Sequence, residues 1–173
     1  MMSEVLLSAR RFRVERRVVE VPGRGPVSRE VVVHPGAVLI LPVLSAAEVV
    51  MIHNYRFAVG RELLELPAGT LEPPEPPEAC AARELEEETG YAAGRIERLC
   101  SFFTTPGFTD ELMHVFVACD LRRTAQRLEG GEQIRVEVMS LSEALAATLD
   151  GRIVDAKTIA ALHLYRARSG APA

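Results

Sequence analysis

The sequence predicts a single α/β domain. Strand-like segments fill the first third of the chain, a helix-forming segment follows a cluster of prolines, and strand-like and helix-like segments share the remainder. The chain has 173 residues, of which 48% are hydrophobic and 25% are charged, and this is the composition of an ordinary globular domain. No repeat or long linker divides the chain, and its length is sufficient to bury a core.

The first third of the chain is predicted to form strands. Residues 13–21 and 29–33 flank a turn of glycine and proline at 23–26, which predicts a β-hairpin. Residues 37–44 are a continuous apolar run of strand length, and residues 49–54 follow after a short polar break. This second pair of segments predicts a second hairpin.

The first helix is predicted over residues 77–89. Four prolines between positions 73 and 77 end the strand region, and proline is tolerated in the first turn of a helix. The segment from Glu78 is rich in Ala, Leu, Glu and Arg, and it stops at Gly90, a residue typical of helix ends. Further strands are expected at 96–103, 112–119 and 134–139, and further helices at 142–149 and 156–166.

Charge is distributed unevenly along the chain. The formal net charge is −4, but residues 61–90 hold nine Glu and two Arg, a local charge of −7. Residues 1–35 hold seven Arg and four Glu, a local charge of +3. The mild net charge argues against a nucleic-acid-binding protein, and the interspersed Glu disfavour use of the Arg-rich segment as an RNA-binding arm.

Neither membrane insertion nor secretion is expected from the sequence. The longest uncharged run, residues 31–47, is shorter than the roughly 20 apolar residues of a membrane helix and contains two prolines. The N-terminus carries scattered Arg rather than a basic stub followed by an apolar core, so no secretory signal is visible. We expect the three cysteines, which lack zinc-site spacing, to be small core residues of a cytoplasmic protein: Cys80, Cys100 and Cys119.

Three acidic side chains share one face of the first predicted helix. At 100° per residue, Glu84, Glu87 and Glu88 lie together, whereas Glu86 lies on the opposite side. This arrangement is poor as plain structure, because the acids lie near the negative end of the helix dipole and repel one another. Three carboxylates on one face would be relieved by a divalent cation, and such ligands favour Mg²⁺ or Mn²⁺ over zinc. On spacing alone, a solvated acidic face is the alternative to a metal site.

The residues around this helix carry a family signature. The pattern G-x5-E-x7-R-E-U-x-E-E-x-G-U of the Nudix hydrolases, where U is aliphatic or aromatic, is matched at every fixed position by Gly69, Glu75, Arg83, Glu84, Leu85, Glu87, Glu88, Gly90 and Tyr91. The chain therefore resembles the Nudix hydrolases. The resemblance implies an α/β/α sandwich with a mixed β-sheet, and Mg²⁺- or Mn²⁺-dependent hydrolysis of a nucleoside diphosphate linked to another moiety.

The resemblance also implies roles for individual residues of this Nudix box. Glu84, Glu87 and Glu88 would supply metal ligands, and the carbonyl of Ala68 would add another. Arg83 would hold Glu75 or Glu87 in place rather than touch the substrate, but it belongs with the candidate catalytic residues.

Residues outside the box resemble the ADP-ribose pyrophosphatase branch of the family. Pro106 lies 16 residues after Gly90, within a Thr-Thr-Pro-Gly-Phe-Thr-Asp-Glu run that ends at Glu111. Arg56 precedes the segment leading into the box, as in that branch. The resemblance makes Arg56, Pro106 and Glu111 candidate substrate-binding residues and implies cleavage of ADP-ribose to AMP and ribose 5-phosphate. The alternatives are another nucleotide sugar, such as GDP-mannose or UDP-glucose, and a non-catalytic ADP-ribose-binding module.

Two further features depend on the same resemblance. Glu132 matches the position of an additional metal ligand or base, but Gly130 stands where the branch often has another acid. The general base is therefore open among Glu132, Glu129 and the box glutamates. Residues 1–35 resemble an N-terminal β extension that pairs with a second subunit, which implies a homodimer, and residues 36–173 resemble the hydrolase domain.

Overall fold

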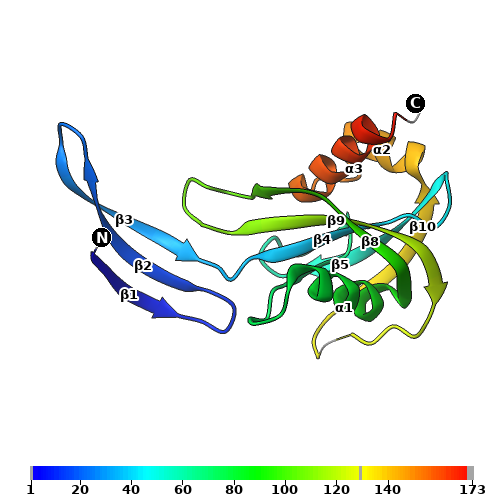
Figure 1. Cartoon of the computed structure of the whole chain (residues 1–173), viewed down its shortest axis with the longest axis horizontal. Coiled ribbons are helices and arrows are strands. Elements are labelled where there is room, and N and C mark those ends of the chain that lie inside the picture. Colours follow the sequence, from blue (N-terminus) through cyan, green and yellow to red (C-terminus); the bar gives the residue numbers. More distant parts are fainter. Residues whose placement is uncertain (1, 129, 171–173) are drawn as a thin grey trace.

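The computed structural model describes residues 2–128 and 130–170, which form a layered body and a separate N-terminal sheet (Figure 1). The strands are β1 (Met2–Ser8), β2 (Arg13–Val21), β3 (Gly25–Val33), β4 (Ala37–Pro42), β5 (Glu48–Arg56), β6 (Arg61–Glu65), β7 (Ala68–Thr70), β8 (Tyr91–Phe103), β9 (Leu112–Arg123) and β10 (Ile134–Ser140). The helices are α1 (Pro77–Thr89), α2 (Leu141–Asp150) and α3 (Ala156–Ser169).

The N-terminal sheet has the strand order β1-β2-β3, and both of its pairings are antiparallel. The pairing of β2 with β3 confirms the first predicted hairpin, whose partners run from Arg13 opposite Val33 to Val21 opposite Gly25. Strand β1 was not predicted. Met2–Ser8 follows no turn signal and shows no clear alternation of apolar and polar residues. The sheet extends away from the body on the side opposite the helices α2 and α3 (Figure 1).

The body contains two sheets. A mixed sheet has the order β7-β4-β9-β8, in which only β4 and β9 are parallel, and an antiparallel sheet has the order β10-β5-β6. The second predicted hairpin is wrong, because β4 and β5 lie in different sheets and share a single bridge between Val43 and Val49. Strand β9 pairs along the whole of β4 and β7 pairs with residues 37–39, so contact with β5 is confined to the Val43–Val49 bridge just after β4.

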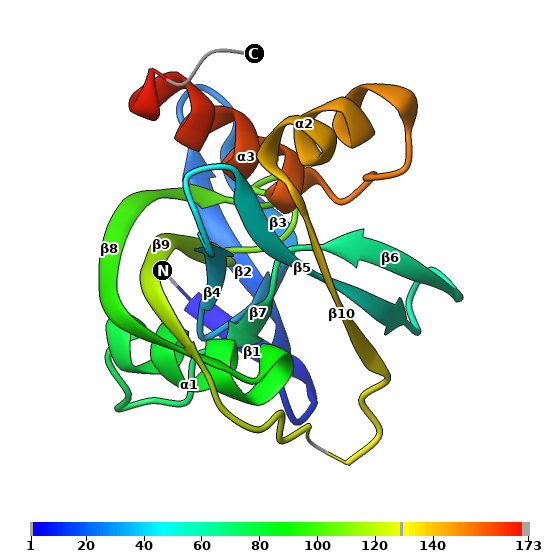
Figure 2. The same ribbon diagram turned by 90° about the vertical axis from the view of Figure 1, so that its right-hand side faces the viewer.

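The helices cover the two faces of the mixed sheet, which confirms the α/β/α sandwich (Figure 2). Val38 and Ile40 of β4 pack toward α1, whereas Leu39 and Leu41 pack toward α2 and α3. Every residue of β4 is buried, because successive side chains of a strand point to opposite faces and both faces are covered. The continuous apolar run in the sequence is thus the mark of the central strand.

The ends of the elements are set by local chemistry. Helix α1 has the predicted bounds, while α2 and α3 begin after the N-caps Ser140 and Asp155, whose side chains accept from backbone N–H groups. Strands β8 and β9 are longer than predicted and pair along most of their length. The cysteines are free thiols, Cys80 buried and Cys100 and Cys119 half-buried. Across residues 2–128 and 130–170, no helix is long and apolar enough to cross a membrane.

Candidate active site

Helix α1 presents its glutamates from a rigid base. Its inner face, which includes Leu85, is buried against β4 and β9, and the helix ends at Gly90 in the left-handed region with φ of 68°. Glu86 lies on another side of the helix, where its carboxylate is 3.3 Å from Arg127. The helix therefore separates Glu86 from the box glutamates, as its periodicity predicts.

Arg83 links three carboxylates of the box. Its guanidinium donates two hydrogen bonds to Glu75, both of 3.0 Å, and its Nη1 donates to Glu84 at 2.8 Å and to Glu87 at 3.0 Å. The hydrogen bonds from Arg83 hold the pKa of Glu75 below its usual value. Arg83 thus makes both of the contacts expected of it. It binds Glu75 through two hydrogen bonds and Glu87 through one.

Glu84 and Glu88 are the two box carboxylates most strongly affected by burial. Burial raises the pKa of Glu84, and it raises the pKa of Glu88 well above the usual range of a glutamate. The negative charge of Glu132 pushes both pKa values in the same direction. The backbone N–H of Ala68 donates to Glu88 at 2.8 Å and partly offsets the effect of burial. The site thus concentrates negative charge that its own donors do not fully balance.

Gly69 allows the backbone to lie against Glu84. A Cβ at this position would be 1.9 Å from the carboxyl carbon of Glu84, so any other residue would displace that carboxylate. The close approach brings the strand β7, which begins at Ala68, directly beside α1. The glycine of the box is therefore required by packing at the carboxylate itself.

These residues fit a divalent metal by their donor chemistry. Glu84, Glu87, Glu88, Glu132 and the Ala68 carbonyl offer only hard oxygen ligands, which suit Mg²⁺ or Mn²⁺. In the part of the chain that the structure describes, no three His, Cys, Asp or Glu side chains are already arranged to hold a metal ion. Two of the proposed ligands, Glu84 and Glu87, both accept hydrogen bonds from Nη1 of Arg83 in this structure.

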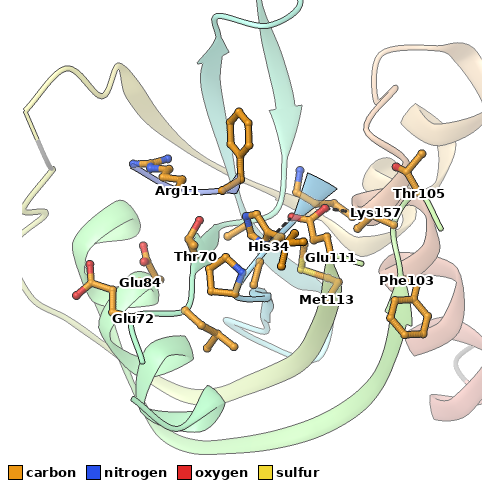
Figure 3. Close-up of a pocket in the computed structure, with 18 of the residues that line it drawn as sticks. Arg11, His34, Thr70, Glu72, Glu84, Phe103, Thr105, Glu111, Met113 and Lys157 are labelled. Atoms are coloured by element: carbon orange, nitrogen blue, oxygen red, sulfur yellow. Dashed lines mark hydrogen bonds and ion pairs between the residues drawn. The ribbon is translucent and has the colours of Figure 1, made fainter. Parts of the chain in front are cut away.

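A cavity of about 1330 Å³ opens beside the box. Of the predicted site residues, those that line it are Arg56, Ala68, Glu84, Glu88, Glu111 and Glu132. Three others, Arg83, Glu87 and Pro106, do not line it, and Glu129 lies outside the described residues. Figure 3 shows Glu84 and Glu72 on one side of the cavity and Glu111 and Lys157 on the opposite side.

The loop between β8 and β9 forms one wall of this cavity. Glu111 accepts a hydrogen bond of 2.5 Å from the Thr104 hydroxyl, and its other oxygen is 3.7 Å from Nδ1 of His34. The loop is also attached to β3, because the Val32 N–H donates to the Phe108 carbonyl at 2.8 Å. Pro106 is exposed within this loop, so its side chain is not placed to line the cavity in a single chain.

Sequence reasoning missed two groups of residues at the cavity. The turn between β1 and β2 reaches it with residues 8–13, of which Arg11 is visible in Figure 3. The start of α3 contributes Asp155 and Lys157. Lys157 is the one lysine in the sequence, which was the only signal available, and a single residue type without a motif carries no prediction.

The fold and the site define the class of this protein as an α/β/α sandwich in which the box carboxylates Glu84 and Glu88 of one helix open on a cavity. The model of the NUDIX domain family matches residues 33–162, which is most of the chain. The chain therefore belongs to the Nudix family, and it is a Nudix hydrolase. Enzymes of this family generally use a divalent metal.

Relatives and a solved structure agree with this assignment. The chain is 42% identical over 146 residues to the ADP-ribose pyrophosphatase of Bacillus subtilis (strain 168), covering 83% of this chain and 79% of that protein. It is 39% identical to the methanol dehydrogenase activator of Bacillus methanolicus, covering 92% and 88%. It is 36% identical to the GDP-mannose pyrophosphatase of Citrobacter koseri, covering 78% and 74%. A crystal structure described as an ADP compounds hydrolase has the same fold, with a TM-score of 0.86 at 24% identity, covering 98% of this chain and 92% of that one.

Proposed function

We propose that this Nudix hydrolase cleaves the diphosphate bond of ADP-ribose to AMP and ribose 5-phosphate, using Mg²⁺ or Mn²⁺. The observation that carries the proposal is that one cavity is lined by the box residues Glu84 and Glu88, by Arg56 and by Glu111. Acidic ligands for a cation thus face the same space as a guanidinium suited to phosphate. The similarity to a relative named ADP-ribose pyrophosphatase supports this choice of substrate.

Each group of residues has a distinct task in this proposal. Glu84, Glu87, Glu88 and the Ala68 carbonyl would hold the divalent ion, and Glu132 would act as a further ligand or as the base. A bound divalent ion supplies the activation of water and the neutralisation of phosphate charge that diphosphate hydrolysis requires. Arg56 binds phosphate oxygens, and Arg83 keeps the box carboxylates in position through its contacts with Glu75, Glu84 and Glu87.

The attacking water must lose a proton as its oxygen bonds to phosphorus and the bridging oxygen leaves. Glu132 is the base that we propose, because it faces the cavity and its charge acts on both Glu84 and Glu88. A box glutamate and Glu129 are the other candidates. Kinetics of Glu132→Gln as a function of pH separate them, because loss of the base removes the acidic limb of the kcat profile.

The test of the proposed function is a direct assay. Purified protein is incubated with ADP-ribose and either Mg²⁺ or Mn²⁺, and the products are separated and identified. We expect AMP and ribose 5-phosphate in equal amounts, and no product when EDTA replaces the metal. Absence of AMP with both metals would overturn the proposal, and ADP-ribose binding without turnover would instead indicate a non-catalytic module.

A second candidate substrate is another nucleotide sugar. The similarity to a GDP-mannose pyrophosphatase favours this alternative, because the box acts on the diphosphate that all of these substrates share. A panel of ADP-ribose, GDP-mannose and UDP-glucose compared by kcat/KM decides between them. We expect ADP-ribose to give the highest value.

We also propose that residues 1–35 form a dimerisation extension and that residues 36–173 are the hydrolase domain of a cytoplasmic homodimer. The N-terminal sheet exposes apolar side chains of β1, including Val5 at 54% and Leu7 at 53%. Its turn reaches the cavity, so a second copy on this sheet would lie close to the site. The three free thiols support a reducing compartment. Sedimentation of the purified protein tests the dimer.

A further inference from the structure

A fully buried carboxylate lies behind the wall of the cavity. Glu65, the last residue of β6, has no exposed surface, and β6 is the outer strand of its sheet. Burying a charge is costly unless that charge is paired. The role of Glu65 is therefore inferred from the cations that it pairs with.

Two cations share the two oxygens of Glu65. Nη2 of Arg56 forms an ion pair with Oε1 at 2.7 Å, without the geometry of a hydrogen bond, and Nζ of Lys157 donates a hydrogen bond to Oε2 at 2.9 Å. Both cations line the cavity, whereas Glu65 itself does not. One buried carboxylate thus holds two cations side by side at the cavity wall.

Lys157 lies in the first turn of α3 and contacts a second carboxylate, that of Asp155. Its Nζ is 2.8 Å from Oδ1 of Asp155, and Oδ2 of the same side chain caps the helix by accepting from Thr158 N at 3.0 Å. The Thr158 hydroxyl accepts from Leu66 N at 2.9 Å, which attaches the helix to the residue after Glu65. An ammonium group has three N–H donors, and the two carboxylates account for two of them. The third remains for a ligand in the cavity.

The position of this cation relative to the box suggests its ligand. Arg56 lines the same cavity as the box carboxylates Glu84 and Glu88. Lys157 is joined to Arg56 through Glu65, and it is across the cavity from Glu84 (Figure 3). The two cations are paired with the same carboxylate and line the same cavity, and a diphosphate presents two adjacent charged groups.

We propose that Lys157 is a second substrate-binding cation of this enzyme and that Glu65 is the positioning residue that holds Lys157 and Arg56 side by side. Arg56 binds the diphosphate near the box, and Lys157 donates its third N–H to a phosphate oxygen farther along the substrate. This inference rests on the proposed hydrolysis of a nucleotide sugar and adds a residue that the family signature does not contain.

The first test replaces the cation. Lys157→Gln removes the charge but keeps a polar side chain, and we expect KM for ADP-ribose with Mg²⁺ to rise about tenfold, the effect of one lost charged hydrogen bond. We expect kcat to change less than about threefold, because the contact is made in substrate and transition state alike. Lys157→Arg should restore KM to within about threefold of the wild-type value. GDP-mannose, where it is hydrolysed, should show the same rise because it shares the diphosphate.

The matched control is Arg152, a cation outside the cavity lining that is also paired with two carboxylates. It contacts Glu143 at 3.2 Å and Asp150 at 3.0 Å. Arg152→Gln should leave KM unchanged. A KM that is the same in Lys157→Gln as in the wild type, or a rise of equal size in Arg152→Gln, would overturn the proposal.

The second test addresses Glu65 without leaving two cations uncompensated. Glu65→Asp keeps the charge but shortens the side chain, so one carboxylate can no longer reach both partners. We expect KM to rise about fivefold at nearly constant kcat and melting temperature. An unchanged KM in a folded Glu65→Asp protein contradicts the positioning role, and so does a fall in kcat alone.

The outcome is separable from that of the proposed function. If the wild-type protein hydrolyses no nucleotide sugar, the proposed function fails, and the phosphate-binding role of Lys157 is measured with ADP and Mg²⁺ by calorimetry. Lys157→Gln must then weaken ADP binding about tenfold relative to the wild type and to Arg152→Gln. Equal dissociation constants in all three proteins would contradict the inference on its own.

Discussion

The body and the N-terminal sheet of this protein are stabilised in different ways. The body has apolar clusters on both faces of its mixed sheet, with Phe116 on one side and Leu39 on the other. In the N-terminal sheet, Glu15 is the one described residue classed as buried, and it is held by Arg13 at 2.6 Å and Arg17 at 2.9 Å. An ionic cluster therefore stands where the body has a hydrophobic core.

This difference allows the proposed catalysis and the proposed assembly to be tested by different substitutions. A three-stranded sheet without an apolar core depends on packing against something else. Its contacts with its own body are concentrated at the loop before β9, where Val32 bonds to Phe108 and Asp110, and where Arg17 lies 3.3 Å from Asp110. The body contains the box and the helices that cover both faces of the mixed sheet. Substitutions in the two regions should therefore affect different measurements.

The largest effect is expected in the body. Glu88→Gln should lower kcat/KM for ADP-ribose by at least about 100-fold, because it removes a charge that faces both the cavity and the proposed metal. The oligomeric state should not change. The matched control is Glu86→Gln on the same helix, whose partner is Arg127 outside the cavity lining. Steady-state kinetics of both proteins check this, and near-wild-type activity of Glu88→Gln would contradict the proposed site.

A smaller effect is expected from the N-terminal sheet, and it concerns assembly. Leu7→Asp should raise the dissociation constant of the proposed homodimer at least about tenfold, because a charge would enter an apolar contact. Leu149→Asp is the control, since this leucine of α2 is 83% exposed in the body. Sedimentation over a range of concentrations measures both. A wild-type protein that stays monomeric, or equal dissociation by both variants, would remove the role proposed for the sheet.

The two regions also differ in what could be predicted from the sequence. The box lies within 23 residues, from Gly69 to Tyr91, so helix periodicity alone brings Glu84, Glu87 and Glu88 to one face. The hairpin of β2 and β3 is local as well, and its turn residues predict it. Local patterns thus predicted the features made by neighbouring residues.

Features that depend on distant residues were not predictable in this way. The contact of Glu65 with Lys157 joins positions 92 residues apart, and no local pattern records it. The second hairpin was predicted wrongly for the same reason, because the true partners of β4 are β7 and β9. The apolar run of β4 indicated a strand but contained no information on which neighbour it would choose.

The smallest effect expected is on stability, and its dependence on pH has opposite signs in the two regions. Burial raises the pKa of Glu88, so the native metal-free body binds more protons than the unfolded chain, and its stability falls as pH rises between the two pKa values. Hydrogen bonds from Arg13 and Arg17 lower the pKa of Glu15. The contribution of Glu15 to stability is therefore present at neutral pH and is lost as pH falls through its lowered pKa.

Melting temperatures of two variants in EDTA, followed from about pH 3 to about pH 8, test this contrast. Glu88→Gln should melt a few degrees above the wild type at the high end of the range, where the wild type must hold a buried charge, and the difference should vanish toward pH 4. Glu15→Gln should melt below the wild type by a nearly constant amount down to about pH 4.5, the usual pKa of a glutamate, and the gap should close only below it, as the pH falls toward the lowered pKa of Glu15. Added Mg²⁺ should stabilise the wild type and leave Glu88→Gln nearly unaffected, because ligand binding raises stability only where the site is intact. The same sign of pH dependence in both variants would show that the two regions do not differ in the way their buried carboxylates are held.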